Sequence, residues 1–371
     1  MRIALISHVR HAIAPPFMGG MEAHNWHLAN DLTRRGHDVT LFAAGDSRTD
    51  AQLWPVLPRC YQCDYVQGDP GLNPYLDAGF ASAVQHIFGG DFDVVHNNSL
   101  HRYPPRMARQ HRIPCVTSLH IPPFDALHRA VRESAAPWSR FTVTSRRQVE
   151  SWWGDAPPPE AAVAYNGIDT TLWPFSPRGN GEAVWAGRIT WNKGAHLAVS
   201  AARLTGIRLT LFGVIEDQAY FDEHIRPYLG HDIRYGGHLA GPDLAVEFGG
   251  ASVLLFTPLW DEPFGLTAVE AMSCGLPVAA IDMGAAREVI GEAGAFADSP
   301  TAEALATALL QAIKIPRTVA RSRVLRRFTT EHMIARYEKQ YALAIAGLGQ
   351  SAPTVTFPPI ELCDVTDKIT A

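Results

Sequence analysis

The stretch SVLLFTPLWDEPFGLTAVEAMSCGLPVAAID, residues 252–282, decides the fold class of this chain. Its two ends, SVLLFTP and PVAAID, are apolar runs of strand length, and a helical pattern begins between them near Gly265. A strand, a helix and a second strand in this order form a parallel pair, because parallel neighbours need a long crossover connection. The stretch therefore predicts a parallel sheet that is covered by helices.

The same alternation extends over nearly the whole chain. In the first half we expect strands at RIALIS (2–7), DVTLFA (38–43), DVVH (93–96), PCVTSL (114–119), FTVT (141–144) and AAVAYN (161–166). In the second half we expect strands at EAVWAGR (182–188), RLTLFG (208–213), DIRYG (232–236), SVLLFTP (252–258) and PVAAID (277–282). Helices are expected at 21–36, capped by Gly36, and from near Lys193, Glu216, Pro242, Gly265 and Ala285. This is an α/β pattern with two doubly wound, Rossmann-like domains.

Length and local composition place the domain boundaries. At roughly 100–200 residues per domain, 371 residues predict two domains. Gly, Pro and Asn cluster at 166–181, where the hydrophobic periodicity stops, so this segment is the predicted linker. We expect a first domain at 1–168 and a second at 169–330, with the C-terminal helix and tail, about 331–371, packing back on the first. Ligands of such sheets bind beyond the carboxyl ends of the strands, which predicts a crevice with one wall from each domain.

The overall charge excludes a general nucleic-acid binder. Thirty-two Lys and Arg against 37 Asp and Glu give a net charge of -5. Apolar runs such as ASVLLFTPLW are too short to span a membrane, and MRIALISHV is too short for a secretory signal, so we expect a cytoplasmic protein. Arginines are frequent from 102 to 147, where a solvated face is favoured. The stripe Arg102, Arg106, Arg109 and Arg112 would alternatively allow weak peripheral contact with anionic lipid at the inner membrane face.

The cysteines do not form a zinc-binding pattern. The chain has five, an odd number, and Cys60 and Cys63 are the only close pair. A structural zinc site would need a second pair. We therefore favour a plain loop at this position over a redox or metal site.

Other candidate metal ligands also favour structural roles. Asp91 and Asp93 precede a buried strand and mark its N-terminal turn. His24 and His27 share a helix face without an evident third ligand, which favours surface or packing roles. We expect no metal site.

The loop and helix after SVLLFTP form the most informative motif. Backbone N–H groups near Gly265, Leu266 and Thr267 have no partner inside the helix, and together with the helix dipole they form a site for a phosphate. Glu270, about one turn into the helix, can accept hydrogen bonds from vicinal hydroxyls such as those of a ribose, while Glu262 can reach another part of the same ligand. Alternatively, Thr267 and Glu270 fit a Thr-x-x-Glu capping box, which would only tie down the helix end.

A second motif, GRITWNKG, follows the strand EAVWAGR. Arg188 can hold a phosphate with its planar fork and Lys193 with a point charge, so the pair can neutralise a diphosphate without a metal. The motif is not a Walker loop, and no GxGxxG follows the first strand. Alternatively, Arg188 and Lys193 lie on a surface loop and bind no ligand.

Two features of the first domain complete the set of candidates. Gly19 and Gly20 lie where the first loop enters a helix and allow a ligand to approach the backbone closely. His120 follows the strand PCVTSL, so its imidazole is placed to hydrogen-bond a sugar hydroxyl or a developing charge. With sixteen histidines in the chain, a structural role for this one is the alternative.

Taken together, these motifs resemble the retaining glycosyltransferase family 4, also described as glycosyl transferase group 1, which has the GT-B fold. The resemblance spans most of the chain and rests on PPFMGGME, RRGHDVTLFAAGDSRT, DFDVVHNNS, TSLH, YNGID, GRITWNKG, EPFGLTAVEAMSCGLPV and GAAREVI. It departs from the family after His120, where members often carry an acidic residue and this chain has Ile121.

The resemblance implies a role for each candidate residue. Arg188 and Lys193 would hold the donor diphosphate, together with the backbone amides of Phe264, Gly265, Leu266 and Thr267. Glu270 would bind the nucleotide ribose, and Glu262 the transferred sugar near its anomeric carbon. Gly19 and Gly20 would face the donor, and His120 would contact the sugar.

The resemblance also implies the reaction. A nucleotide-diphosphate sugar, expected to be a UDP-sugar, would donate to a hydroxyl of a glycan, a lipid-linked acceptor or a small molecule, with retention at the anomeric carbon and without a metal or other cofactor. Loops of the first domain, above all residues 45–73, would select the acceptor. The alternatives are a GT-B nucleotide-sugar epimerase and a non-catalytic protein that binds nucleotide sugars.

Overall fold

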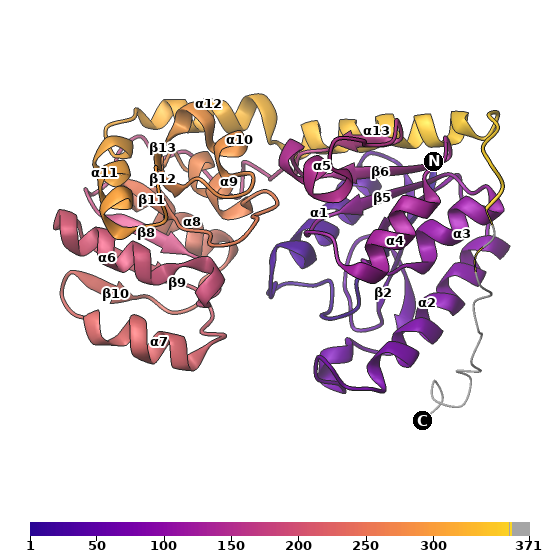
Figure 1. Cartoon of the computed structure of the whole chain (residues 1–371), viewed down its shortest axis with the longest axis horizontal. Helices are drawn as coiled ribbons and strands as arrows, with labels where there is room; N and C mark the ends of the chain where they lie inside the picture. Colours follow the sequence, from indigo (N-terminus) through magenta and orange to yellow (C-terminus); the bar gives the residue numbers. More distant parts are fainter. Residues whose placement is uncertain (356, 358–371) are drawn as a thin grey trace. The chain divides into compact units, whose positions relative to one another are not determined.

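The computed structural model describes residues 1–355 and 357, which form two compact units (Figure 1). Unit 1 comprises Met1–Thr144, Val149–Ala164 and the chain from Ile334 onward. Unit 2 comprises Ser145–Gln148 and Tyr165–Met333. The observed divisions thus lie a few residues away from the expected boundaries at 168 and 330.

Unit 1 is built on a seven-stranded parallel sheet in the order β3-β2-β1-β4-β5-β6-β7. The strands are β1 (Arg2–Ser7), β2 (Asp38–Ala44), β3 (Gln52–Leu57), β4 (Val94–Asn98), β5 (Cys115–Leu119), β6 (Ser139–Val143) and β7 (Ala161–Val163). The strand order reverses between β1 and β4. Because parallel crossovers are right-handed, this reversal places helices on both faces of the sheet.

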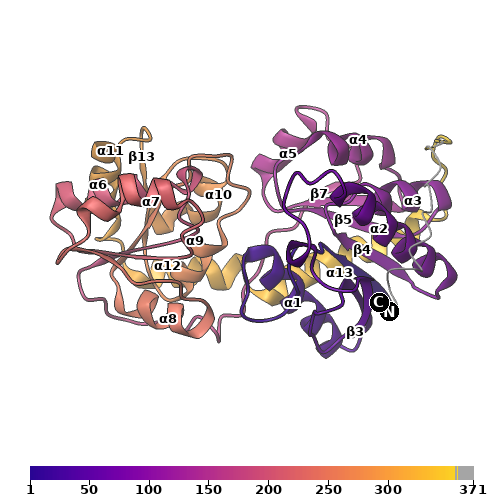
Figure 2. The ribbon, with the colours of Figure 1, turned by 90° about the horizontal axis from the view of Figure 1, so that it is seen from below.

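The helices of unit 1 follow its strands (Figure 2). They are α1 (Gly20–Arg34), the short 3-10 helix η1 (Tyr61–Cys63), α2 (Leu72–Gly89), α3 (Tyr103–His111) and α4 (Asp125–Ser134). Two further helices, α5 (Arg146–Trp153) and α13 (Thr330–Gly347), begin in unit 2 and continue in unit 1. The first helix ends before Gly36, whose φ of +85° is a left-handed conformation that favours glycine. The C-cap itself is Arg35, and Gly36 follows it, so the predicted helix end is displaced by one residue.

Unit 2 repeats the design with six parallel strands in the order β10-β9-β8-β11-β12-β13. Its strands are β8 (Ala183–Ala186), β9 (Leu209–Phe212), β10 (Ile233–Tyr235), β11 (Val253–Phe256), β12 (Val278–Ile281) and β13 (Gly294–Ala297). Its helices are η2 (Trp191–Lys193), α6 (Ala195–Thr205), α7 (Gln218–His224), η3 (Arg226–Tyr228), α8 (Gly241–Gly250), α9 (Leu266–Ser273), α10 (Ala286–Ile290), η4 (Gly291–Ala293), α11 (Ala302–Ala312) and α12 (Arg317–Arg327). The predicted α/β class and the eleven expected strands are confirmed.

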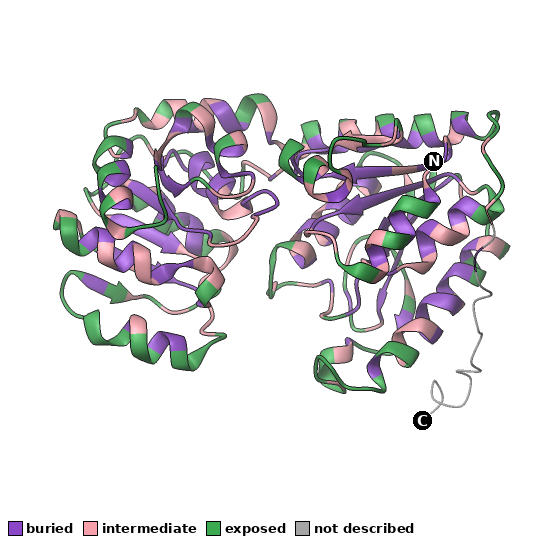
Figure 3. Ribbon diagram, in the orientation of Figure 1, coloured by how far each residue is buried: buried purple, intermediate pink, exposed green. Residues whose placement is uncertain are grey.

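Two strands were not predicted, and both lie at a sheet edge. Strand β3 contains Pro55, which has no N–H for a ladder hydrogen bond and argues against a strand in a sequence pattern. Strand β13 has only four residues, GAFA. Central strands such as β5, β11 and β12 are buried throughout, as Figure 3 shows. The continuous apolar runs of β11 and β12 made these two strands predictable.

Helix α13 packs on unit 1 through both polar and aromatic contacts. Tyr341 is buried, and its hydroxyl lies 2.6 Å from His96 Nδ1 in β4. Glu338 accepts hydrogen bonds from Arg35 and is 3.0 Å from His37 Nε2. These contacts fasten the C-terminal helix beside the first helix and the centre of the sheet.

Candidate functional site

In unit 2 the centre of the candidate site is an ion pair between Lys193 and Glu262. Lys193 Nζ lies 2.7 Å from Glu262 Oε2, and the Trp260 indole N–H donates to the same oxygen at 2.7 Å. The ammonium also lies 4.8 Å from the centre of the Trp260 ring, within range of a cation–π interaction. Glu262 is only 7% exposed, so this pairing compensates the cost of burying its charge.

Backbone contacts at the carboxyl ends of β8 and β11 position this pair. Thr257, the residue after β11, donates through Oγ1 to the carbonyl of Lys193 at 2.8 Å and accepts from Trp185 Nε1 at 2.9 Å. A Cβ at Gly194, whose φ is +65°, would overlap the Thr257 carbonyl oxygen. Lys193 therefore ends η2 directly before a tight turn into α6, where a glycine must follow it.

The Glu262 loop is fixed from its other side. A Cβ at Gly284, whose φ is +60°, would overlap the backbone of Glu262, and the Ala285 N–H donates to the Glu262 carbonyl at 2.8 Å. Two loops far apart in sequence thus touch through a single glycine. This contact fixes the backbone that carries the Glu262 carboxylate.

Helix α9 begins as the sequence predicted. Gly265 is its N-cap residue with φ +87°, and a Cβ there would lie 2.7 Å from the Phe256 ring. Leu266 is the first helical residue, so the backbone N–H groups of Leu266 and Thr267 lie in the first turn, where no helical carbonyl accepts them. No side chain caps the helix. The capping-box alternative is therefore wrong, because Thr267 lies inside the first turn and not at the N-cap.

Phe264 contributes packing as well as backbone to this loop. Its ring is buried and lies 5.5 Å from the Phe328 ring and 6.4 Å from that of Tyr165. The side chain is therefore part of the core of unit 2. Only its backbone is left for a ligand.

Glu270 lies in the second turn of α9 and is half-buried. Burial raises the pKa of its carboxyl to about 7. Within the part of the chain that the structure describes, its carboxylate has no hydrogen-bonding partner. A desolvated carboxylate without a partner gains by binding a ligand that brings hydroxyl donors.

Arg188 differs from Lys193 in its surroundings. Its guanidinium is about half exposed and pairs with Glu216 Oε2 at 2.7 Å. The described residues show no contact between Arg188 and Lys193. Surface ion pairs contribute little to stability, so the Arg188 side chain can change partner at low cost.

In unit 1 a chain of amide hydrogen bonds fixes the protonation of His120. Asn25 Nδ2 donates to the Met21 carbonyl at 2.9 Å, Asn98 Nδ2 donates to Asn25 Oδ1 at 2.9 Å, and His120 Nε2 lies 3.1 Å from Asn98 Oδ1. A backbone carbonyl can only accept, so the direction of every bond in this chain is determined. His120 therefore carries its proton on Nε2, and its Nδ1 is an acceptor.

The ring of His24 lies beside that of His120. Their centroids are 4.5 Å apart in an edge arrangement, and the His24 ring also contacts Tyr337 of α13 at 6.1 Å. His24 is buried, and its Nε2 has no hydrogen-bond partner among the described atoms. Packing, the role predicted for His24, does not account for this nitrogen, because buried polar atoms normally form a hydrogen bond.

Glu22 and His8 lie near the predicted glycines. Gly20 is the first residue of α1 and Gly19 its N-cap, as expected. A Cβ at Gly19 would lie 3.1 Å from Glu22 Oε2, and Glu22 Oε1 is 3.3 Å from His8 Nε2. Sequence reasoning missed both residues, although His8 directly follows β1 just as His120 directly follows β5.

The histidines of this cluster are neutral at physiological pH. Burial is the main cause of all their shifts, and it lowers the pKa of His8 to about 4, that of His96 to about 3 and that of His120 to about 4. It also lowers the pKa of His24 well below its usual range. The candidate site in unit 1 therefore offers neutral donors and acceptors around one buried carboxylate.

Asp91 and Asp93 have the structural role that their position predicted. Asp91 forms an ion pair with Arg2, and Asp93 accepts from the Arg2 N–H at 2.7 Å, directly before β4. Among the described residues, only Asp46, Cys60 and Cys63 bring three potential metal-ligating atoms together.

The four arginines of the stripe all have partners within unit 1. Arg102 and Arg106 form ion pairs with acids of α2 and α4. Arg109 and Arg112 donate to backbone carbonyls of residues 348–353, which follow α13. Two of the four arginines of the stripe therefore hold the segment after α13. A contact of the stripe with anionic lipid stays a prediction. No helix in the described chain is long and apolar enough to cross a membrane.

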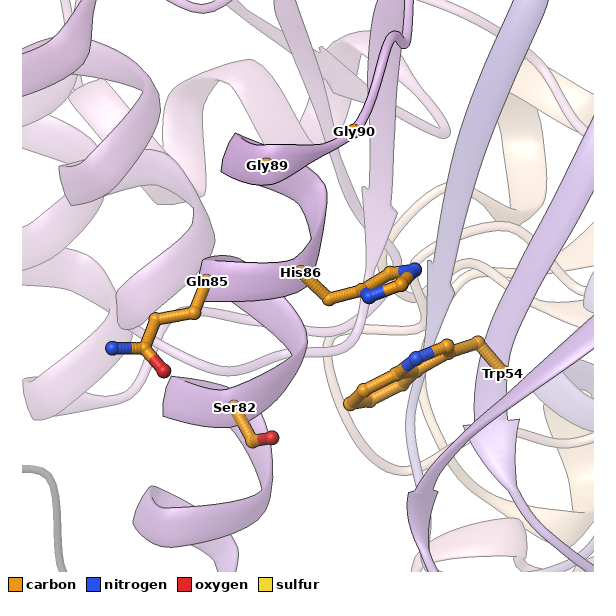
Figure 4. A pocket seen from close by; sticks show the side chains of 6 residues that line it. All are labelled: Trp54, Ser82, Gln85, His86, Gly89 and Gly90. Carbon is orange, nitrogen blue, oxygen red and sulfur yellow. The ribbon is translucent and has the colours of Figure 1, made fainter.

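A surface pocket of about 470 Å³ lies between β3 and α2, away from the candidate residues in sequence (Figure 4). Its lining comprises Trp54, Ser82, Gln85, His86, Gly89 and Gly90. The rings of Trp54 and His86 stack on each other, with centroids 5.1 Å apart. None of the predicted site residues lines this pocket.

Comparison with known proteins supports the class that the fold and site define, a GT-B glycosyltransferase. Residues 18–172 match the model of Glycosyltransferase Family 4, and residues 176–326 match that of Glycosyl transferases group 1. The chain is 26% identical to the glycogen synthase of Mycobacterium tuberculosis over 97% of its own length and 99% of that protein.

Solved structures show the same fold. Sucrose-phosphate synthase from Thermosynechococcus elongatus matches with a TM-score of 0.74 and 21% identity, over 93% of this chain and 99% of that one. HepE from Anabaena, in complex with UDP and glucose, matches with a TM-score of 0.69 and 20% identity, over 92% of this chain and 100% of that one.

The two family models together cover most of the chain, and it belongs to glycosyltransferase family 4. It is therefore an enzyme of the transferase class with the GT-B fold, as the motifs predicted. The names of its relatives favour transfer over the epimerase and binding-only hypotheses.

Proposed function

We propose that this protein transfers a sugar from a UDP-sugar to a hydroxyl acceptor, with retention at the anomeric carbon and without a metal ion. The observation that carries the proposal is the ion pair between the half-buried Lys193 and the buried Glu262, which lies four residues before α9 begins at Leu266. A cation and an uncapped helix N-terminus both bind phosphate, and a buried carboxylate beside them can bind sugar hydroxyls.

The cations act on the leaving group. Cleavage of the bond between sugar and diphosphate leaves negative charge on the β-phosphate, and preorganised donors lower the barrier to that step. Lys193 and Arg188 each exchange their present carboxylate partner for a phosphate oxygen when the donor binds. The N–H groups of Leu266 and Thr267 supply further donors. Two cations and a helix N-terminus can balance a diphosphate, which is why the proposal includes no metal.

Glu270 and Glu262 bind different parts of the donor. The Glu270 carboxylate accepts the two ribose hydroxyls, which supply the partners it lacks in the free protein. Glu262, released from part of its interaction with Lys193, accepts hydroxyls of the transferred sugar near the anomeric carbon. No side chain is assigned as a nucleophile, and the departing phosphate accepts the proton of the acceptor hydroxyl.

His120 contacts the sugar as a neutral acceptor. Its Nε2–H is committed to Asn98, so Nδ1 is the atom that accepts a hydroxyl proton in a hydrogen bond. Gly19 and Gly20 leave room for the donor close to the start of α1. Asn98 and Asn25 are positioning residues in this scheme, because they act through the imidazole.

The nucleotide is proposed to be uridine diphosphate because HepE, a structural relative, holds UDP in its solved complex. The acceptor is a hydroxyl of a glycan, a lipid-linked molecule or a small molecule. Residues 45–73, which include β3 and η1, are the proposed selector of the acceptor.

The test is a screen of the purified protein against UDP-, GDP-, ADP- and dTDP-sugars in the presence of EDTA. We expect UDP-sugars to raise the melting temperature and to be hydrolysed slowly, and Glu270→Ala to abolish both effects. NMR of the released or transferred sugar then reports its anomeric configuration. Activity that requires added metal, inversion at the anomeric carbon, or a response to another nucleotide alone would each contradict the corresponding part of the proposal.

A further inference from the structure

Cys60 and Cys63 bring their sulfur atoms together at the surface of unit 1. The two Sγ atoms lie 2.9 Å apart, on either side of the single turn of η1. A disulfide bond measures about 2 Å, so a movement of less than about 1 Å separates this dithiol from bonding distance. Both cysteines are free thiols in the structure.

The two thiols differ in access to solvent. Cys60 is 9% exposed, whereas Cys63 is exposed. Burial raises the pKa of Cys60 to about 12, and hydrogen bonds with Cys63 and Asp46 contribute to this shift. Cys63 is therefore the thiol that an external reagent reaches first, and Cys60 is held behind it as an internal partner. This asymmetric arrangement is typical of redox-active pairs.

A metal site at the same place fits the geometry less well. Asp46, Cys60 and Cys63 supply three donor atoms within 4.8 Å of one another. However, Asp46 Oδ1 already accepts the backbone N–H of Cys60 at 3.0 Å. Two zinc–sulfur bonds of about 2.3 Å at a tetrahedral angle hold the sulfurs about 3.8 Å apart, well beyond the separation observed here.

The pair is linked by backbone hydrogen bonds to the loop between β1 and α1. The N–H of Tyr61 donates to the Val9 carbonyl at 3.0 Å, and the N–H of Gln62 donates to the Arg10 carbonyl at 3.4 Å. The Arg10 guanidinium donates to Gln62 Oε1 at 3.2 Å. The two residues between the cysteines therefore hold the beginning of the loop that ends at Gly19.

We propose that Cys60 and Cys63 form a reversible disulfide by exchange with a disulfide oxidant of the glutathione class, and that this bond stiffens the loop between β1 and α1. The Cys63 thiolate attacks the oxidant, forms a mixed disulfide and releases one thiol. Cys60 then loses its proton and attacks the Cys63 sulfur, forming the internal disulfide and releasing the second thiol. The protein loses two electrons and two protons, and the oxidant gains both.

The loop effect follows from the hydrogen bonds of η1. A disulfide across Cys60 and Cys63 closes a short ring that contains Tyr61 and Gln62, so their N–H groups lose freedom. The carbonyls of Val9 and Arg10 that accept from them are then held more firmly. Disulfide formation itself does not depend on the proposed transferase mechanism; only an effect on donor binding rests on it.

The first experiment titrates the full chain, carrying Cys363→Ser to remove the fifth thiol of the sequence, against defined ratios of reduced and oxidised glutathione. After blocking and trypsin digestion, cleavage after Arg59 and Arg102 yields one peptide that contains both cysteines. As the ratio becomes oxidising, we expect this peptide to lose both blocking groups and to have the mass of the dithiol less two hydrogen atoms. Reduction before blocking should restore both groups. A peptide that stays reduced in oxidised glutathione alone would overturn the proposal, as would one tightly bound zinc ion per chain that protects both thiols.

The single variants test the asymmetry. Cys60→Ser leaves the exposed Cys63 to accumulate a mixed disulfide with glutathione. Cys63→Ser leaves only the buried Cys60, which we expect to react at least about tenfold more slowly. Equal reactivity of the two single variants would contradict the assigned roles. The buried Cys115 and Cys274 serve as internal controls and stay unmodified in both.

The second experiment measures hydrogen exchange of a peptide covering residues 8–20 in the oxidised and reduced protein. We expect the oxidised form to exchange at least about threefold more slowly in this loop, with no change for a peptide of α11. The Cys60→Ser/Cys63→Ser double variant is the control, and it shows no dependence on the glutathione ratio. A disulfide that forms without slowing this exchange would refute the loop effect. Neither readout requires transferase activity.

Discussion

The two units carry candidate residues at the same place in their sheets but use different physics there. In unit 2 the side chains after β8 and β11 are charged and paired, with Lys193 against Glu262 and Arg188 against Glu216. In unit 1, Asn98 at the end of β4 and His120 after β5 belong to a neutral chain of hydrogen bonds in which amide groups set the tautomer of His120. A charged site suits a diphosphate, and a neutral one suits sugar hydroxyls. The same architecture thus carries charged side chains at the strand ends of unit 2 and uncharged hydrogen-bonding side chains at the strand ends of unit 1.

The largest effect is expected from removing one charged side chain from the candidate site of unit 2. Lys193→Ala should lower turnover by roughly 10²–10³-fold, as for the loss of one donor to a developing anion. Steady-state kinetics with a saturating donor measures the change, and circular dichroism verifies the fold. Lys314→Ala, which removes an exposed lysine of the same unit, is the matched control and should leave turnover unchanged. Near-normal turnover of Lys193→Ala would remove the diphosphate assignment.

A second prediction uses the pKa of Glu270, which burial raises to about 7. Ribose hydroxyls that donate to the carboxylate favour its charged form, so binding lowers this pKa and releases a proton. Affinity for a UDP-sugar should therefore rise with pH, by up to about tenfold per unit, as pH increases toward 7.

Isothermal titration in buffers of different ionisation enthalpy measures both the affinity and the released proton. Glu270→Gln is isosteric and cannot titrate, so its affinity should be lower and independent of pH. Proton release that persists in Glu270→Gln would assign the effect to another group.

The neutral side of the comparison is tested at Asn98. Asn98→Ala removes the acceptor of His120 Nε2–H and leaves the tautomer free to change. A lost hydrogen bond of about 1 kcal/mol corresponds to roughly a fivefold loss in kcat/KM.

Asn98→Asp restores an acceptor and adds a charge, which raises the pKa of His120. Its activity should recover at pH 8 and fall as pH decreases, and this pH profile separates tautomer control from packing. A profile identical to that of Asn98→Ala would contradict tautomer control.

The smallest effect concerns stability. His96 is buried and neutral, with its pKa lowered to about 3, whereas in the unfolded chain it has its ordinary value near 6.5. Unfolding therefore takes up a proton below pH 6.5, and stability falls as pH decreases, by at most about 1.4 kcal/mol per unit for this residue.

Chemical denaturation at pH 7 and pH 5 measures the slope. His96→Gln should be less stable at pH 7 and should lose part of this pH dependence. His111→Gln, the same replacement at an exposed position, is the matched control. An unchanged slope in His96→Gln would show that other groups cause the acid sensitivity.

Sequence reasoning succeeded where a local pattern carried the information. Continuous apolar runs located β11 and β12, and Gly265 located the start of α9, because a left-handed residue at a helix start favours glycine. His120 was found because the residue after a parallel strand lies at the ligand-binding edge.

The features that the sequence did not predict depend on contacts between residues far apart in the chain. The pairing of Lys193 with Glu262 joins two strand ends that are 69 positions apart. The relay from Met21 through Asn25 and Asn98 requires the packing of α1 on β4, which no local pattern encodes. The Cys60–Cys63 pair looked like an ordinary loop because only the fold shows how closely the sulfurs approach.

The Lys193–Glu262 pair has a consequence for selectivity. In the free protein the carboxylate acts as a resident counter-ion, so an incoming anion must displace it and not simply meet a vacant cation. Inorganic phosphate can satisfy Lys193 but leaves the buried Glu262 with only the Trp260 donor, at a cost in free energy. A nucleotide sugar brings an anion for the lysine and hydroxyls for the glutamate in one molecule. Under the proposed function, the pair therefore acts as a filter that rejects incomplete ligands and helps to expel the spent nucleotide.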